Sequence, residues 1–403
     1  MTDIRIVIGA NFGDEGKGLM TDYYAAQAAE QKKTAIVVLS NGGAQRGHTV
    51  VTCGGKRHVF HHFGSGTYAG ADTYLPEKYI VNPMVFMKEY EEFWGSGENG
   101  TIRTKIYVNP GCLVTTPFEM ITNQILEQSR NDARHGSCGI GIWETIVRDG
   151  RRFGELLSMD DEQLRNYLDE CRKFQKNRLV KKGITQIDDK WQEIIDDPKL
   201  MEHYISDLRE MTLLVKLSED GVIANYDRII FENGQGLLLD EDRTEFGVHT
   251  TPSHTGLKNP AEIVRHVFGK TDPGKKEEEN RKRKIDTEVC YVTRTYMTRH
   301  GAGQFATECP KEQINPDMTD LTNVPNPYQG TIRYGHLDWE KLQERVQEDF
   351  EKEALPDICE SRIAIALTHV NEYRMESRAG VTYVSDGEDR DSVKKPLAEP
   401  AIF

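Results

Sequence analysis

The sequence predicts an α/β protein with a large, mostly parallel central β-sheet that is flanked by helices. Three observations lead to this prediction. Residues 4–8 are a β-branched apolar run typical of a buried strand, and a glycine-rich turn and a helical segment at 19–31 follow. Similar apolar runs recur at 34–39, 106–108, 228–236, 289–294 and 363–367. Residues 153–223 instead carry charge and Leu/Ile at helical spacing, which predicts two to four helices inserted beside the sheet.

The composition is that of a globular protein with a polar surface. Its 403 residues, 37% hydrophobic and 29% charged, suffice for one large domain with insertions or for two domains. The net charge of -14 disfavours nucleic acid and anionic membranes as partners. Seven cysteines without a Cys-x-x-Cys pair fit a reducing compartment and give no zinc site. We expect no secretory signal and no membrane span, and therefore a cytoplasmic protein, in host cytoplasm if a phage encodes it.

The turn after the first strand carries the strongest functional signal. Residues 9–18 read Gly-Ala-Asn-Phe-Gly-Asp-Glu-Gly-Lys-Gly. Glycines let backbone N–H groups close around phosphate oxygens, and a helix N-terminus adds positive potential. Lys17 offers a point charge for a terminal phosphate, and Asp14 and Glu15 are carboxylates suited to Mg²⁺ or to proton transfer. The spacing is not that of the usual P-loop, although we expect a P-loop-NTPase-like fold. An ordinary glycine turn with surface charges is the alternative.

A second glycine-rich stretch follows the next strand. Residues 41–51 read Asn-Gly-Gly-Ala-Gln-Arg-Gly-His-Thr-Val-Val, which predicts a loop that feeds a strand. A loop histidine such as His48 is by itself most simply a surface residue. His58, His61 and His62 could suggest a metal site, but they alternate poorly for a chelate. Packing or support of a nucleotide loop is the favoured interpretation of these three.

Both loops resemble those of adenylosuccinate synthetases, which read Gly-Asp-Glu-Gly-Lys-Gly and Gly-Gly-x-Asn-Ala-Gly-His-Thr. That family joins L-aspartate to C6 of a 6-oxopurine nucleotide through a 6-phosphoryl intermediate and consumes a nucleoside triphosphate. The resemblance implies that Asp14, Lys17 and His48 are catalytic, and that Asp14 and the Gly47 carbonyl hold Mg²⁺. We expect a single domain over residues 1–403, with a helical insertion at about 151–225 and a charged loop at about 269–285.

Other segments match the family's nucleotide-binding motifs. Residues 135–150 resemble Thr-Thr-Gly-Arg-Gly-Ile-Gly and the helix after it, and residues 231–240 resemble Phe-Glu-Gly-x-Gln-Gly followed by Leu-Leu-Asp. Arg148 falls on an arginine that reaches a phosphate across a dimer interface in the family, although a solvated helix charge is an equal alternative. The residues that the resemblance assigns to nucleotide and phosphate are Gly13, Glu15, Gly16, Gly18, Gln45, Ser137, Cys138, Arg148, Gln235 and Thr250.

The C-terminal third carries the motifs for aspartate and for the donor base. Residues 296–308 resemble Tyr-Thr-Thr-Arg-x-Gly-x-Gly-Pro-Phe-Pro-Thr-Glu, and the implied aspartate ligands are Arg299, Thr331 and Arg333. Gly330 stands where a ribose-contacting arginine is expected, which favours a deoxyribonucleotide, although Arg46 could supply charge from elsewhere. Thr368, His369 and Asn371 match the family's Thr-Lys-x-Asp donor-base motif. An amide fits the adenine edge better than the guanine edge, so we expect ATP as donor.

These departures resemble a phage subgroup of the family that uses dGMP. The lead hypothesis is therefore a ligase, acting as a homodimer, that converts dGMP, L-aspartate and ATP into N6-succino-2-amino-2'-deoxyadenylate, ADP and phosphate. An ordinary adenylosuccinate synthetase that uses IMP and GTP is the runner-up. Two alternatives from other classes are a nucleotide-binding regulator without catalysis and a phosphotransferase such as a nucleotide kinase.

Overall fold

The computed structural model describes residues 2–396 except 96, 132–133, 270–284, 319–327, 329, 354, 356–357 and 376–377. Its described part contains a ten-stranded sheet in the order β17-β16-β15-β11-β1-β10-β2-β5-β7-β9. All neighbouring strands are parallel except β16 and β17. The strands are β1 (Thr2–Gly9), β2 (Ala35–Val38), β5 (Asp72–Leu75), β7 (Ile106–Val108), β9 (Val215–Leu217), β10 (Arg228–Gly236), β11 (Ile285–Arg294), β15 (Glu360–Thr368), β16 (Val381–Ser385) and β17 (Val393–Lys394). The predicted α/β fold is confirmed.

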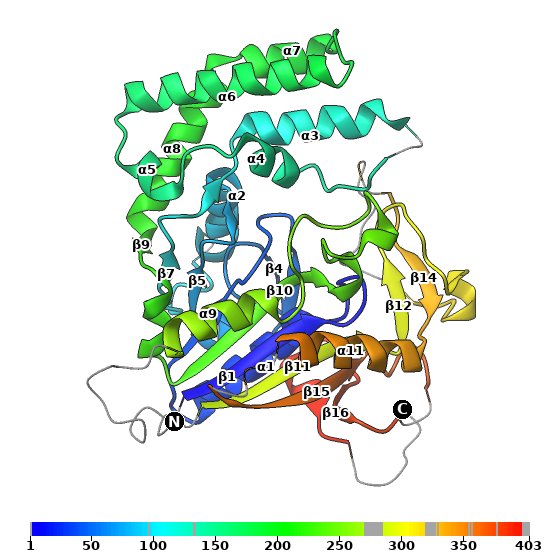
Figure 1. Cartoon of the computed structure of the whole chain (residues 1–403). Coiled ribbons are helices and arrows are strands. Elements are labelled where there is room, and N and C mark those ends of the chain that lie inside the picture. Colours follow the sequence, from blue (N-terminus) through cyan, green and yellow to red (C-terminus); the bar gives the residue numbers. More distant parts are fainter. Residues whose placement is uncertain are drawn as a thin grey trace.

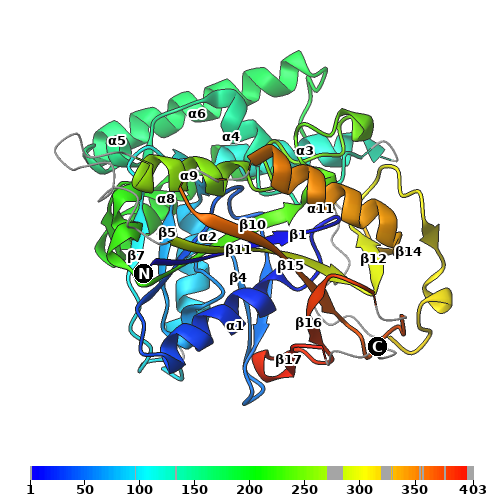
Figure 2. The same ribbon diagram turned by 60° about the horizontal axis from the view of Figure 1, so that its bottom comes forward.

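Helices cover both faces of this sheet. Figure 2 shows α1 (Lys17–Glu30) on one side, and α9 (Lys258–Phe268) and α11 (Trp339–Glu353) on the other. Strand β1 feeds both cores, because successive side chains of a strand point to opposite faces. Val7 packs with the α1 core, whereas Ile4, Ile6 and Ile8 pack with the α9 and α11 core.

A layer of helices stands beyond one end of the sheet (Figure 1). It includes α2 (Pro83–Tyr90), α3 (Pro117–Ser129), α4 (Ile142–Arg148), α5 (Phe153–Leu157), α6 (Asp161–Lys181), α7 (Asp189–Asp196) and α8 (Pro198–Leu214). The longest, α6, begins with a capping box in which Asp160 and Gln163 each accept the other's backbone N–H, at 2.8 and 2.9 Å. The segment predicted to be helical also holds β9, which joins the sheet edge. The single-domain organisation stays a prediction, and the charged loop at 270–284 lies outside the described residues.

Three smaller sheets complete the described fold. Strands β3 (His48–Val51) and β4 (Arg57–Phe60) form a hairpin, and β6 (Ile80–Val81) pairs with β8 (Leu113–Val114). An antiparallel sheet joins β12 (Tyr296–Arg299), β14 (Arg333–His336) and β13 (Glu308–Cys309). The sequence did not predict this last sheet, which carries the two arginines expected to bind aspartate.

The parallel register brings several loops to one edge of the large sheet. Gly9 pairs with Gly236 of β10 and with Val292 of β11, and Arg294 pairs with Thr368 of β15. The carboxyl ends of these four strands therefore lie together, which is where ligands bind in α/β sheets. No described helix is long and apolar enough to cross a membrane.

Candidate active site

The loop between β1 and α1 closes on itself. Gly13 and Gly16 have positive φ values of 120° and 97°, which side chains other than glycine rarely adopt. The Lys17 ammonium donates to the Gly13 carbonyl at 2.5 Å, and the Gly13 N–H donates to the Glu15 carboxylate at 2.8 Å. Glu15 Oε2 lies 3.9 Å from Lys17 Nζ. The loop is thus shaped by its own carboxylate and ammonium.

Burial shifts the pKa values of both charged groups, Glu15 and Lys17. It raises the pKa of Glu15, against the opposing charge of Lys17. It lowers the pKa of Lys17, and here the charge of Glu15 opposes the shift. The Lys17 side chain is 0% exposed. Because little water competes for such an ammonium, it suits an anionic phosphate oxygen.

His48 lies directly against the start of α1. A Cβ on Gly18 would lie 2.6 Å from the Thr49 carbonyl oxygen and 3.3 Å from the Cβ of His48. A side chain at Gly18 would clash with the backbone of β3, so the last glycine of the motif allows the two glycine-rich loops to meet. The catalytic residues predicted on both loops are therefore neighbours.

The His48 imidazole belongs to a buried charge network. Its Nδ1 lies 2.5 Å from Glu232 Oε1 on β10 and 2.8 Å from Arg46 Nη2. Arg46 and Glu232 also pair directly at 3.3 Å. The backbone N–H and the hydroxyl of Ser65 donate to Glu232 at 3.0 and 2.5 Å. This network fixes the ring at the wall of the site.

The network sets the charge of its members. Burial, followed by the charge of Arg46, lowers the pKa of His48 to about 3. Burial of Glu232 opposes its ionisation, but Arg46 and His48 outweigh it and lower its pKa to about 2. At neutral pH the imidazole is neutral and Glu232 is ionised. The charge of Lys17 also contributes to the His48 shift, so the two predicted catalytic groups act on each other.

A cavity of about 820 Å³ opens at these loops, a volume suited to a nucleotide. The predicted site residues that line it are Gly13, Asp14, Gln45, Gly47, His48, Ser137, Cys138, Gln235 and Thr250. Glu15, Gly16, Lys17 and Gly18 form the loop and helix start beside Asp14. The structure therefore brings the purine and phosphate parts of the prediction together.

Two glutamine amides face this cavity from different loops. Gln45 lies in a turn that the Arg46 N–H closes on the Gly43 carbonyl at 3.1 Å. Gln235 is the penultimate residue of β10 and has a positive φ of 57°. Within the described chain, both amide atoms of Gln45 and the Oε1 of Gln235 are buried without a hydrogen-bond partner. Each such atom costs about 1–3 kcal/mol, so both side chains are suited to receive a polar ligand edge.

The segment expected to bind phosphate lies only in part at the cavity. The Ser137 hydroxyl donates to Asn123 Oδ1 at 3.0 Å, and burial raises the pKa of Cys138 to about 11, which keeps the thiol protonated. Arg148 is not among the residues that line the cavity. Its guanidinium donates to Glu119 at 2.8 Å and to the Val114 carbonyl at 2.9 Å. The role of Arg148 across a dimer interface stays a prediction.

The predicted aspartate ligands lie together on the antiparallel sheet, where Arg299 pairs in register with Arg333. The Arg299 guanidinium stacks 4.5 Å from the Phe12 ring and donates to the Gln304 carbonyl. Arg333 donates to Glu308 at 2.8 Å. Thr331 is exposed just before β14. These residues are absent from the lining of the main cavity, but Gln304 lines an adjoining hollow of about 520 Å³.

Thr368, the first of the predicted donor-base residues, contacts the loop between β1 and α1, here called the phosphate loop. Thr368 ends β15, and its hydroxyl donates to the Glu15 carbonyl at 2.8 Å. A Cβ on Gly16 would lie 3.3 Å from the Thr368 methyl group. His369 follows with a positive φ of 59°, and Asn371 is exposed in the next turn. The structure thus places Thr368, the first residue of this motif, beside the loop between β1 and α1.

The sequence model of the adenylosuccinate synthetase family matches residues 6–348. The chain belongs to the adenylosuccinate synthetase family. It is 29% identical over 311 residues to the adenylosuccinate synthetase of Teredinibacter turnerae and 26% identical over 312 residues to that of Chlorobium chlorochromatii. Each alignment covers 75% of this chain and 64% of the relative, so the chain spans less than two thirds of the length of these relatives.

Solved structures with similar folds include two synthetases. The fully ligated adenylosuccinate synthetase of Plasmodium falciparum gives a TM-score of 0.60 at 17% identity, covering 99% of this chain and 87% of that one. The succinoaminodeoxyadenylate synthetase of cyanophage S-2L, bound to dGMP and dATP, gives a TM-score of 0.59 at 14% identity, covering 98% of this chain and 95% of that one. At these identities the likeness concerns the fold alone.

The residues expected to hold Mg²⁺ in an adenylosuccinate synthetase fit that ion. Asp14 and Gly47 both line the cavity, and the Gly47 backbone is exposed. A carboxylate and a backbone carbonyl are oxygen ligands of the kind that Mg²⁺ prefers. His300 Nε2 lies 3.4 Å from Asp14 Oδ2, and both residues line the same cavity.

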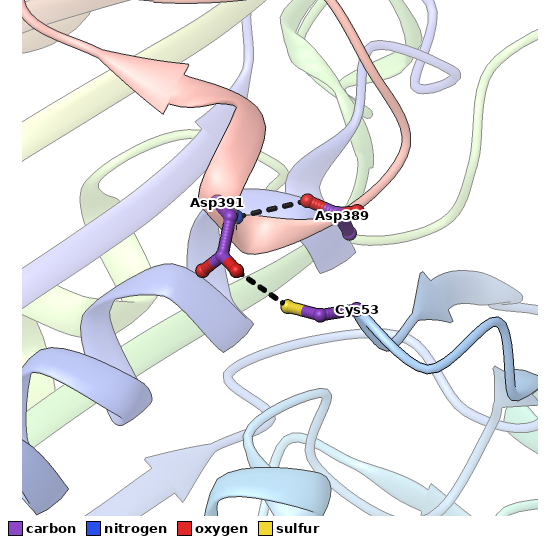
Figure 3. A group of neighbouring side chains, drawn as sticks. All are labelled: Cys53, Asp389 and Asp391. Carbon is purple, nitrogen blue, oxygen red and sulfur yellow. Dashed lines mark hydrogen bonds between the residues drawn. The ribbon is translucent and has the colours of Figure 1, made fainter.

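Two other groups in the described chain have metal-binding geometry, but neither contains a predicted site residue. In the first, shown in Figure 3, Asp391 accepts from the Cys53 thiol at 2.9 Å and Asp389 accepts the Asp391 N–H. In the second, Lys258 approaches His254 at 2.7 Å beside Asp240. In both groups, atoms that could bind a metal already make contacts with other groups of the protein.

Sequence reasoning assigned no role in the site to two residues that the structure places there. Ser65 holds Glu232, and His300 approaches Asp14. His300 directly follows Arg299 inside a recognised motif, so its position gave a usable signal. No sequence signal pointed to Ser65, because its partner Glu232 lies far away in the sequence.

Proposed function

We propose that this chain is a C–N ligase that joins L-aspartate to C6 of a purine nucleoside monophosphate at the expense of ATP. The contact between its two glycine-rich loops is the observation that carries this proposal. Gly18 allows the loops to meet, Asp14 and His48 line one cavity, and the charge of the buried Lys17 ammonium acts on His48. Membership of the adenylosuccinate synthetase family supports the same chemistry.

The proposed reaction has two steps. The purine 6-oxygen attacks the γ-phosphorus of ATP, ADP leaves, and Asp14 accepts the N1 proton. The amine of aspartate then attacks C6 and loses a proton to the phosphate, which leaves with the former 6-oxygen. Lys17 and the loop N–H groups would bind the transferred phosphoryl group. His48 would donate to the 6-oxygen through Nε2 once the negative charge of the bound nucleotide protonates its ring. Mg²⁺, when bound by Asp14 and Gly47, would neutralise phosphate charge.

The supporting features favour dGMP and ATP as the nucleotides. Gly330 offers no side chain for a ribose hydroxyl, and among the described residues a Cβ there would meet no atom within 4 Å. The amide of Asn371 matches an adenine edge. The cyanophage synthetase of similar fold was solved with dGMP and dATP. The proposed product is N6-succino-2-amino-2'-deoxyadenylate.

The second candidate uses IMP and GTP. It is favoured by the relatives of Teredinibacter turnerae and Chlorobium chlorochromatii, which both carry the name adenylosuccinate synthetase. In either case Arg299, Thr331 and Arg333 would bind aspartate. Ser137, Cys138 and Thr250 would bind the nucleotide phosphate, with Arg148 completing the site in a homodimer.

A matrix assay tests the proposal. IMP, GMP and dGMP are each combined with ATP, dATP and GTP, with and without L-aspartate, and products are identified by mass spectrometry. We expect aspartate-dependent phosphate release and a succinyl adduct with dGMP and ATP. Turnover only with IMP and GTP would select the second candidate. Phosphoryl transfer without aspartate would indicate a kinase, and binding without turnover would indicate a regulator.

A further inference from the structure

His61 follows β4, and its ring contacts the loop that precedes His48. The ring Nδ1 lies 3.1 Å from the Ala44 carbonyl oxygen and also bonds the Arg46 carbonyl oxygen. Carbonyl oxygens only accept hydrogen bonds, so Nδ1 carries a proton and donates to both. A Cβ on Gly47 would lie 3.6 Å from the His61 Cε1. The imidazole therefore supports the chain from Ala44 to Gly47.

His61 is itself held by a buried carboxylate on α2. Glu89 is 2% exposed and accepts the backbone N–H groups of His61, His62 and Phe63 at 2.8, 2.7 and 3.4 Å. The Tyr79 hydroxyl donates to the His61 carbonyl at 2.8 Å. His61 therefore has a fixed backbone, and its ring has a defined direction.

The supported segment carries groups that face the cavity. Gln45 lies between the two carbonyls that His61 holds, and its buried amide atoms have no partner in the described chain. Gly47 lies just beyond the second carbonyl and also lines the cavity. Rotation of either peptide would turn the Gln45 amide and the Gly47 carbonyl away from their present directions.

We propose that His61 is a positioning residue for nucleotide binding. By donating to the Ala44 and Arg46 carbonyls, it holds the Gln45 amide toward the nucleotide and the Gly47 carbonyl at the cavity wall. This inference rests on the proposed function, because it requires that the cavity binds a purine nucleoside monophosphate. His61 acts through the loop and takes no part in the chemical steps.

Two amide substitutions separate hydrogen bonding from simple packing. The amide nitrogen of an asparagine falls near the position of Nδ1, whereas that of a glutamine falls near Nε2. We expect His61→Asn to bind dGMP or IMP within about threefold of the unaltered chain. His61→Gln and His61→Phe should weaken binding about 10- to 100-fold, the range seen when a group that orients a ligand is lost.

His58 provides the matched control. Its Nε2 lies 3.8 Å from the same Glu89, and its ring packs on Phe60 and Phe93. The described contacts of His58 do not include the loop from Ala44 to Gly47. The His58→Asn and His58→Gln variants should therefore bind nucleotide equally well, with no preference for asparagine.

The experiment measures nucleotide dissociation constants by calorimetry and backbone hydrogen exchange of the ligand-free loop by mass spectrometry. Exchange over residues 43–48 should rise at least about tenfold in His61→Gln and His61→Phe but not in His61→Asn. Equal losses in His61→Asn and His61→Gln, unchanged binding in His61→Phe, or no nucleotide binding by the unaltered chain would each overturn the inference. Nucleotide binding without ligase turnover would refute the proposed function alone.

Discussion

The purine side and the aspartate side of the candidate site hold their polar groups in different ways. On the purine side, His48 and Glu232 form a network whose side chains are 6% and 0% exposed, and the amide of Gln45 has no partner among the described residues. On the aspartate side, Arg333 is 25% exposed and already pairs with Glu308, which is 43% exposed. The purine side is fixed by burial, whereas on the aspartate side only Arg299 is buried and Arg333 is held by a pair near the surface.

This difference predicts how each side responds to substitution. A buried network keeps its geometry because its members have no alternative partner in water. A surface ion pair contributes only about 0–1 kcal/mol, so a substrate carboxylate can replace Glu308 at Arg333 with little loss. We therefore expect changes on the purine side to reduce kcat, and changes on the aspartate side to raise KM.

The largest effect should come from Lys17. Replacing it with methionine removes a buried ammonium beside the phosphate loop, and kcat for aspartate-dependent phosphate release should fall about 10²- to 10³-fold. Lys33→Met is the control, because Lys33 pairs with Asp3 near the surface at 3.7 Å. A Lys17→Met enzyme with unchanged kcat would remove Lys17 from the proposed mechanism.

Glu232→Gln should lower kcat about 10- to 100-fold, because it removes the charge that orients His48. It should also change the acid stability of the protein. The folded pKa of Glu232 is about 2, below its ordinary value of 4.5. The carboxylate therefore stabilises the fold above pH 4.5, and this contribution is lost as the pH falls through 2.

Denaturant unfolding at a series of pH values measures this effect. The unfolding free energy of the unaltered chain should fall more steeply between pH 4.5 and 2 than that of Glu232→Gln. Glu202→Gln, which alters an exposed pair with Arg165, should leave the profile unchanged. Identical profiles for the unaltered chain and Glu232→Gln would contradict the assigned charge.

On the aspartate side, Arg333→Gln should raise the KM for aspartate about tenfold and change kcat less. Glu308→Gln removes the competing carboxylate and should keep the KM within about threefold, since the surface pair is weak. Steady-state kinetics with aspartate varied provide the test. A large kcat loss in Arg333→Gln would show that the two sides do not differ as proposed.

Asn371→Asp should have the smallest effect. A carboxylate accepts from the guanine edge, so the preference for ATP over GTP should shift toward GTP. Because Asn371 is exposed, about 1 kcal/mol is expected, which corresponds to roughly a fivefold change in the ratio of kcat/KM values. Competition between ATP and GTP measures this ratio, and an unchanged ratio would argue against a base-reading role.

Local patterns in the sequence predicted most of the large sheet. The runs at β1, β10 and β15 were found within a few residues because each is apolar and bounded by polar or glycine turns. The strand β9 was missed because its three residues, Val-Lys-Leu, carry no periodic signal. The start of β11 at Ile285 was missed because the polar residues that follow it continue a charged run.

The glycine-rich loops follow from the local sequence, because a glycine at a positive φ and a lysine at a helix start are local features. Which groups meet at those loops depends on how distant segments pack together. Glu232 reaches His48, Thr368 reaches Glu15 and His61 reaches Ala44 because parallel strand order and hairpin pairing bring distant segments together. The burial that sets the charges of Lys17, His48 and Glu232 arises from the same packing, which no local pattern encodes.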